Sequence, residues 1–168
     1  MKREMDEIKK LDCEGFKECS SIRELRLSTK IIPKIKGVYV VIRNKDTAPQ
    51  FLEKGTGGFY KGKDPNVSIE ELKSNWVEDS KIVYIGKGGD PSKKATLNSR
   101  IKQYLNFGKG NKVGHYGGRY IWQLSDAEDL IIAWKPLPDE SPSEVETRMI
   151  DEFKRLHNGR RPFANLSK

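Results

Sequence analysis

Hydrophobic residues in this chain gather in short runs and in helical stripes. Residues 36–43, KGVYVVIR, are β-branched and aromatic and follow a proline, so they predict a β-strand. KIVYIG at 81–86 predicts a second strand, and DLIIAWK at 129–135 predicts a third. We expect the first two strands to pair in the manner of a hairpin, in spite of the long connection between them.

Helices are indicated where the apolar spacing changes to three and four residues. Residues 97–107 form such a segment, which a glycine ends. Its apolar stripe consists of Leu97, Ile101, Tyr104 and Leu105. A final helix is predicted from Pro142 to about His157, because a serine before the proline can cap its first turn. GGRYIWQLS at 117–125 predicts a shorter helix between these two.

The remaining segments lack long apolar patterns. Residues 1–30 alternate charged and apolar groups and predict one or two short helices on the outside. Residues 44–80 are rich in turn-forming residues and are interpreted as an insertion between the first two strands. A short helix is expected to begin within it near Ser68, with Glu71 reaching back to the cap. The chain of 168 residues is thus expected to fold as one small domain with three strands.

Composition narrows the protein class. Hydrophobic residues make up 35% of the chain and charged residues 33%, which is typical of a soluble, polar protein. No apolar run approaches the roughly 18 residues of a membrane span, and the N-terminus lacks the apolar region of a signal peptide. We therefore expect an intracellular, cytoplasmic location and no membrane partner. Cys13 and Cys19 are expected to stay reduced, and the cysteines and histidines lack the spacing of a structural zinc site.

Positive charge is concentrated in one segment. The formal net charge is +8, and residues 81–120 contain nine basic residues against the single acid Asp90, which gives 9 − 1 = +8. The nine are Lys81, Lys87, Lys93, Lys94, Arg100, Lys102, Lys109, Lys112 and Arg119. Aromatic residues and His115 are interleaved with them, which favours a nucleic acid partner over a merely solvated face. Glycines interrupt the segment too often for an amphipathic membrane-binding helix.

Two charged residues fall on helix faces otherwise suited to the core. Arg100 lies on the apolar stripe of 97–107, and Glu146 lies on the apolar side of the final helix. A buried charge needs a partner. Arg100 is therefore a structural ion-pair member, a side chain that reaches out to water, or a phosphate clamp. Glu146 is either the partner of a core cation or a metal ligand.

Five motif pieces occur in a fixed order along the chain. They are GVY at 37–39, YIG at 84–86, Arg100 on a helix, Glu146 on a later helix, and Asn165 in RPFANLS. In this order the set resembles the GIY-YIG nuclease family. The resemblance implies an α+β fold, a small three-stranded antiparallel sheet flanked by helices. It also implies a nuclease domain at 36–168 that carries the insertion at 44–80, after an N-terminal helical extension at 1–35.

The resemblance implies metal-dependent hydrolysis of phosphodiester bonds in DNA, expected to be double-stranded, with Mg²⁺ or Mn²⁺ as cofactor. Tyr39 would act as general base or orient the attacking water, and Tyr84 would help to position it. Glu146 would hold one divalent cation, Arg100 would bind the scissile phosphate, and Asn165 would brace the site. One carboxylate with waters and substrate oxygens suits Mg²⁺, and a cation offsets the negative charge of the ester.

Three further residues join the expected site. A phenol with an ordinary pKa of about 10 is a poor base at neutral pH unless cations favour its phenolate, and Lys87 and Arg100 are candidates for that role. Tyr104 stands where some family members carry a histidine, and it either donates to the phosphate or packs in the core. His115 either assists the leaving group, contacts DNA or is incidental. The expected nucleic-acid-binding residues are Lys87, Lys93, Lys94, Lys102, Lys109, Lys112, His115 and Arg119.

Other functions stay open at the level of sequence. The chain is alternatively a catalytically inactive nucleic-acid-binding domain of the same fold, or the polar cluster only ties strands to helices. The insertion serves DNA contact, substrate gating or packing. The preferred DNA substrate and the oligomeric state are also open.

Overall fold

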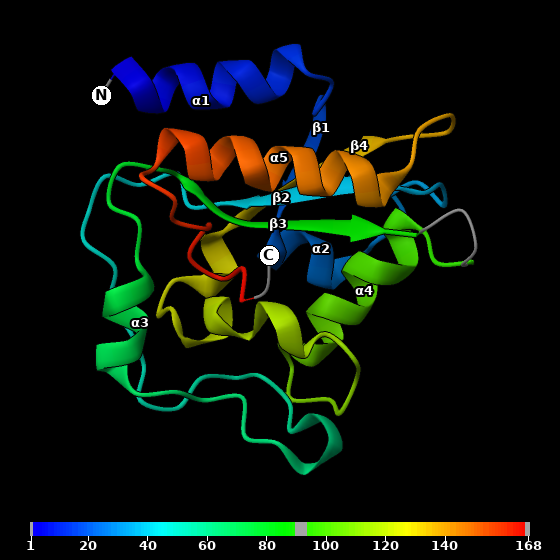
Figure 1. Ribbon diagram of the computed structural model, residues 1–168. Coiled ribbons are helices and arrows are strands. Elements are labelled where there is room, and N and C mark those ends of the chain that lie inside the picture. Colours follow the sequence, from blue (N-terminus) through cyan, green and yellow to red (C-terminus); the bar gives the residue numbers. More distant parts are fainter. Residues whose placement is uncertain (1, 90–93, 167–168) are drawn as a thin grey trace.

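A four-stranded antiparallel sheet lies at the centre of the fold (Figure 1). The computed structural model describes residues 2–89 and 94–166. Its strands are β1 (Glu18–Ser21), β2 (Gly37–Ile42), β3 (Ile82–Gly88) and β4 (Ile131–Pro136). They follow the order β1-β4-β2-β3, and every neighbouring pair is antiparallel. The α+β class is confirmed, and so are the three strands that the apolar runs predicted.

The expected number of strands is wrong, because β1 adds a fourth. β1 has the sequence ECSS and pairs with β4, with Glu18 opposite Trp134. Four largely polar residues at the edge of a sheet carry no apolar alternation, so the hydrophobic pattern could not reveal them. The segment 1–35 is therefore not a purely helical extension. Its β1 belongs to the central sheet and follows α1 (Lys2–Cys13).

The predicted long helices are confirmed. The remaining helical elements are α2 (Ile22–Leu27), α3 (Ile69–Asn75), α4 (Leu97–Phe107), α5 (Pro142–Leu156) and the 3₁₀ segments η1 (Tyr60–Gly62), η2 (Tyr116–Gln123) and η3 (Ala127–Asp129). The hydroxyl of Ser141 caps α5, and that of Ser68 caps α3, as expected. The carboxylate of Glu71, however, accepts from the hydroxyl of Tyr120. The short helix expected within 117–125 is a 3₁₀ helix.

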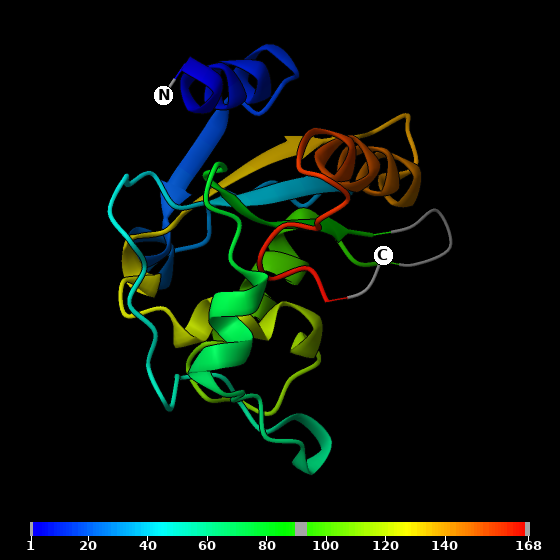
Figure 2. The same cartoon turned by 60° about the vertical axis from the view of Figure 1, so that its left-hand side comes forward.

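Helices cover both faces of the sheet (Figures 1 and 2). α1 and α5 lie over one face, and α2, α4 and η2 lie over the other. Side chains alternate along a strand, so Val38 and Val40 of β2 pack with apolar residues of α5, whereas Tyr39 and Val41 pack with those of α4. This alternation turns Tyr39 toward the helix that carries Arg100.

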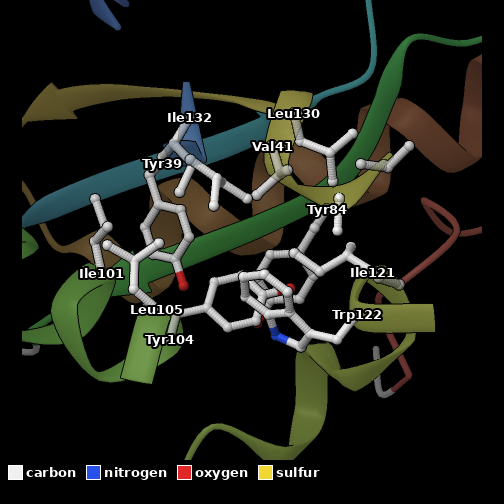
Figure 3. Close-up of a cluster of buried hydrophobic side chains, with 14 of the residues drawn as sticks. Tyr39, Val41, Tyr84, Ile101, Tyr104, Leu105, Ile121, Trp122, Leu130 and Ile132 are labelled. Atoms are coloured by element: carbon white, nitrogen blue, oxygen red, sulfur yellow. The ribbon is translucent and has the colours of Figure 1, made fainter. Parts of the chain in front are cut away.

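A glycine opposite Tyr39 lets its ring lie across β3. In the ladder between β2 and β3, Tyr39 is paired with Gly86. A Cβ atom at Gly86 would lie 2.5 Å from Cζ of Tyr39 and 2.8 Å from Cε2 of Tyr84, which is too close for packed carbon atoms. The glycine thus makes the space in which two tyrosines of neighbouring strands gather, and Figure 3 shows both side chains close to Tyr104.

The structure also bears on the cysteines and on membrane crossing. Cys13 and Cys19 carry free, exposed thiols, as expected. Within the two described stretches of the chain, no helix combines the length and the apolar character that crossing a bilayer requires.

Replacing Gly86 with alanine is expected to lower the free energy of unfolding by about 1–3 kcal/mol, because the new methyl group overlaps the ring of Tyr39. Urea denaturation measures this loss. Gly117→Ala is the matched control, since no atom lies within 4 Å of a Cβ atom built there. Equal stability of the two variants would show that the ring moves aside without cost.

Candidate active site

Five of the eight residues expected at the site meet at one cavity of about 300 Å³. The cavity lies where β2 and β3 meet α4 and α5, so residues far apart in the sequence line it. Its lining consists of Tyr39, Tyr84, Lys87, Gly89, Ala95, Arg100, Gln103 and Glu146. Within the described residues, the cavity therefore joins both motif tyrosines, the helix arginine and the helix glutamate.

The two motif tyrosines differ in how openly they face the cavity. Their ring centroids are 6.1 Å apart, and the rings come from neighbouring strands. Tyr39 has no exposed surface, whereas Tyr84 is 9% exposed. The hydroxyl of Tyr39 lies 2.7 Å from Nε2 of His115, behind the cavity. Tyr84 is thus the phenol that a molecule entering the cavity reaches more readily.

Burial favours the neutral form of both phenols. It raises the pKa of Tyr84 to about 12, with a further contribution from the negative charge of Glu146. It also raises the pKa of Tyr39 well above its ordinary value. Arg100 lowers both pKa values, as the sequence led us to expect, but burial outweighs it. In this structure both tyrosines are therefore protonated at neutral pH.

Arg100 is held at the cavity wall by neutral groups. Its Nη1 donates to Oε1 of Gln103 at 2.5 Å and to the carbonyl of Gly114 at 2.8 Å. Among the described residues these hydrogen bonds do not involve a carboxylate, so the structural ion-pair interpretation of Arg100 gains no support. A guanidinium that is fixed in place by neutral groups suits the recognition of a phosphate.

Glu146 and Lys87 line the cavity from two different elements, α5 and β3. Glu146 lies on α5 and is 8% exposed. Lys87 lies on β3, and its Nζ donates to the hydroxyl of Ser143 on α5 at 2.7 Å. This bond ties the end of the edge strand to the first turn of the helix that carries Glu146.

Asn165 supports β3 from outside the cavity. Its amide accepts from the backbone N–H of Ile85 and donates to the backbone carbonyl of Ile85, both at 2.9 Å. Since β3 is an edge strand, this pair of bonds satisfies backbone groups that no neighbouring strand meets. The side chain thus holds the backbone of the residue next to Tyr84.

Tyr104 and His115 are placed differently from the expectation. Tyr104 is fully buried, and its hydroxyl donates to the carbonyl of Gly118 at 2.6 Å, so it is not available to a phosphate. His115 is 1% exposed and stacks on Tyr104 with centroids 3.8 Å apart, so it does not lie on a DNA-binding surface. Burial and the charge of Arg100 lower the pKa of His115 well below its ordinary value. The ring is therefore neutral, and its contact with the cavity lining is the one between its Nε2 and the hydroxyl of Tyr39.

The expected nucleic-acid-binding lysines lie mostly on the surface. Lys93 falls outside the described residues. The exposed members are Lys94, Lys102, Lys109 and Lys112. Arg119 is partly buried, and its guanidinium lies 4.1 Å from the ring centroid of Tyr116.

The donor set fits Mg²⁺ or Mn²⁺ better than a metal that needs a full protein cage. Among the described residues, no group of three or more His, Cys, Asp or Glu side chains could hold a metal ion. Glu146 offers a carboxylate at the cavity. The other side-chain oxygens of the lining belong to the phenols of Tyr39 and Tyr84 and to the amide of Gln103. Mg²⁺ keeps several waters and is often bound through one or two carboxylates, so this set is compatible with it.

The raised pKa of Tyr84 predicts a loss of stability at alkaline pH. An unfolded phenol ionises near pH 10, whereas Tyr84 ionises near 12 in the folded protein, so the stabilisation is complete below pH 10 and is lost as the pH rises toward 12. By pH 11.5 this single group should cost about 2 kcal/mol. Urea unfolding from pH 8.5 upward should show a shallower decline for Tyr84→Phe than for the unaltered chain. Parallel curves would contradict the raised pKa.

Comparison with known proteins adds no relative to this picture. No protein-family model matches the chain, and no curated protein or solved structure is significantly similar to it. The resemblance to GIY-YIG nucleases therefore rests on the motif residues and their order along the sequence.

Proposed function

We propose that this protein is a metal-dependent endonuclease of the GIY-YIG type that hydrolyses phosphodiester bonds in DNA. The observation that supports the proposal is the cavity itself. Two strand tyrosines, an arginine and a glutamate line one space of about 300 Å³, although residues 39 and 146 lie 146 − 39 = 107 positions apart in the chain. The excess of basic residues between 81 and 120 supplies the positive charge that a polyanionic substrate requires.

The cavity residues divide the work of ester hydrolysis. Arg100 binds the non-bridging oxygens of the phosphate, whose charge increases as the water oxygen bonds to phosphorus. The bond from phosphorus to the leaving sugar oxygen breaks, and the proton that the water loses ends on that oxygen, so that the products are a phosphomonoester and an alcohol. Tyr84, the more accessible phenol, orients the attacking water, and Tyr39 lies behind it. Lys87 adds a second positive charge at the open end of β3. Glu146 would hold the divalent cation, which when bound supplies charge that stabilises the phosphate and favours ionisation of the nearby phenols.

His115 acts as a positioning residue in this scheme. Its Nε2 lies 2.7 Å from the hydroxyl of Tyr39, and its ring is fixed by the stack on Tyr104. Since burial disfavours the imidazolium, the ring holds the phenol in place as a neutral hydrogen-bond partner. Sequence reasoning missed this contact.

The second candidate function is a nucleic-acid-binding domain without catalysis. The observation in its favour is that burial keeps both phenols protonated in this structure. This function predicts salt-sensitive DNA binding and no cleavage with any divalent metal.

Purified protein should nick or linearise plasmid DNA with Mg²⁺ or Mn²⁺. Arg100→Ala should reduce the rate by about 10²–10³-fold, and Glu146→Gln should reduce it to background, because each removes charge that acts on the phosphate. Glu144→Gln is the matched control, since this exposed residue lies two positions away on the same helix.

Circular dichroism and metal-free DNA binding show whether the variants stay folded. Cleavage by the Glu146→Gln variant at the rate of the unaltered chain would show that this cavity is not the catalytic site. Tight binding by the unaltered chain without cleavage in either metal would favour the second candidate function.

The positioning role of His115 predicts a graded response. His115→Phe keeps a ring against Tyr104 but lacks the nitrogen that meets Tyr39, so kcat should fall by roughly 10–100-fold with little change in KM. His115→Gln restores a polar atom and should recover part of the rate. Steady-state kinetics on a labelled duplex separates the effect on kcat from the effect on KM. Equal rates for the Phe and Gln variants would leave His115 with a packing role only.

A further inference from the structure

The insertion brings a second group of basic residues to the side of the molecule that carries the loop after α4. Residues 54–63 contain Lys54, Lys61 and Lys63 and no acid, and residues 109–119 contain Lys109, Lys112 and Arg119 and no acid. The two segments together carry 3 + 3 = +6, and the exposed acids Glu53 and Asp64 directly flank the first of them, which leaves 6 − 2 = +4 for residues 53–64 and 109–119. We call these two segments the basic lobe. Apart from Arg119, its charged side chains are exposed.

Backbone contact makes the two segments one surface. A Cβ atom at Gly58 would lie 1.9 Å from the carbonyl oxygen of Asn111, so only a glycine lets the chains touch there. The hydroxyl of Tyr116 donates to the carbonyl of Asp64 at 2.8 Å. The Nζ of Lys63 lies 5.9 Å from the ring centroid of Tyr116.

The insertion is anchored, so the lobe is a fixed part of the fold. The side-chain amide of Gln123 in η2 donates to the carbonyl of Val67 and accepts from the N–H of Val67, both at 2.9 Å. The N–H of Leu52 donates to the carbonyl of Gln123 at 2.7 Å. Figure 2 shows the insertion running beside the η2 segment. Lysines presented on such a scaffold lose less conformational entropy on binding than lysines on a free loop.

The lobe is continuous with the active-site cavity. Gly114 accepts from Arg100, which lines the cavity. A Cβ atom at Gly114 would lie 3.5 Å from the hydroxyl of Tyr60 in the insertion. Gly114 thus lies between Arg100 of the cavity and Tyr60 of the insertion. A duplex whose phosphate enters the cavity would extend over this side of the molecule.

An exposed aromatic ring at the tip of the insertion completes the surface. Phe59 is 46% exposed and stands directly before η1. Lys61 in η1 has a φ of 54° and Gly62 a φ of 74°, so the chain turns sharply at this point. A large apolar side chain that is held among lysines fits the sugars and base edges of a groove between two phosphate strands.

From these observations we propose that the basic lobe binds the sugar–phosphate backbone of duplex DNA next to the cavity, with Lys54, Lys61 and Lys63 on phosphates and Phe59 in the adjoining groove. This assigns DNA contact to the exposed lysines and Phe59 of the insertion, whereas its anchoring residues pack against η2. The inference rests on the proposed DNA substrate, but it concerns binding and is tested without cleavage.

The test measures binding of a fluorescent 30-base-pair duplex by anisotropy in EDTA across a series of salt concentrations. Each lost phosphate contact lowers the slope of log K against log salt by about 0.9, so the Lys54, Lys61, Lys63→Ala triple variant should reduce the slope by about 3. The control triple variant changes Lys9, Lys10 and Lys17, which lie in or just after α1, at the opposite end of the molecule in Figure 1. It should leave the slope almost unchanged.

Phe59→Ala separates the apolar contact from the charge. It should weaken binding severalfold without changing the salt slope, because it removes no cation. An unchanged slope in the insertion triple variant would overturn the inference, and so would a preference of the unaltered chain for single-stranded over duplex DNA.

Cleavage assays distinguish this inference from the proposed function. The unaltered chain could cleave DNA while the insertion triple variant binds DNA with the same salt slope as the unaltered chain. This result would contradict DNA binding by the basic lobe and support the nuclease proposal. The slope could instead decrease as expected while no divalent metal supports cleavage. This result would support DNA binding by the basic lobe and contradict the nuclease proposal.

Discussion

The close approach of two buried phenols across one strand ladder is the constraint on which the site depends. Gly86 makes the space for the ring of Tyr39 beside Tyr84. Tyr104 of α4 packs against both rings, at centroid distances of 6.4 and 5.3 Å, and His115 stacks on Tyr104. The aromatic cluster therefore fixes α4 and the loop that follows it relative to the sheet. Arg100, one turn before Tyr104, is carried to the cavity by the same packing.

This cluster also decides the electrostatics of the cavity. Rings packed so closely exclude water, which raises the phenol pKa values and lowers that of His115. Arg100 is partly buried at the wall of this cavity, and its positive charge acts against burial by lowering the pKa of both phenols. An anionic ester entering this space would meet the cations Arg100 and Lys87 and two neutral hydroxyls, together with the carboxylate of Glu146. Such an arrangement favours a transition state that gains negative charge over a ground state that has less of it.

The sequence could predict those parts of the fold and of the candidate site that leave a periodic or a motif signal. β2 and β3 were visible as apolar runs, α4 and α5 as stripes with caps, and the cavity residues as motif members or as charges on apolar faces. β1 was not visible, because four polar edge residues owe their conformation to the pairing with β4. The contact of Tyr39 with His115 spans 76 residues and involves an irregular loop, so no local pattern encodes it. Tyr104 was ambiguous because stripe position alone does not say where a hydroxyl points.

The loop after α4 links the cavity to the insertion. The Gly114 carbonyl of this loop accepts from Arg100, and its His115 contacts Tyr39. In η2, which follows directly, the carbonyl of Gly118 accepts from Tyr104. On its outer side the same loop touches the insertion at Asn111 and Tyr116. A displacement of the insertion would therefore act on three contacts of the site through one short segment. The long connection between the two motif strands thus has a mechanical consequence, since it supports the loop that orders the arginine and the buried tyrosine.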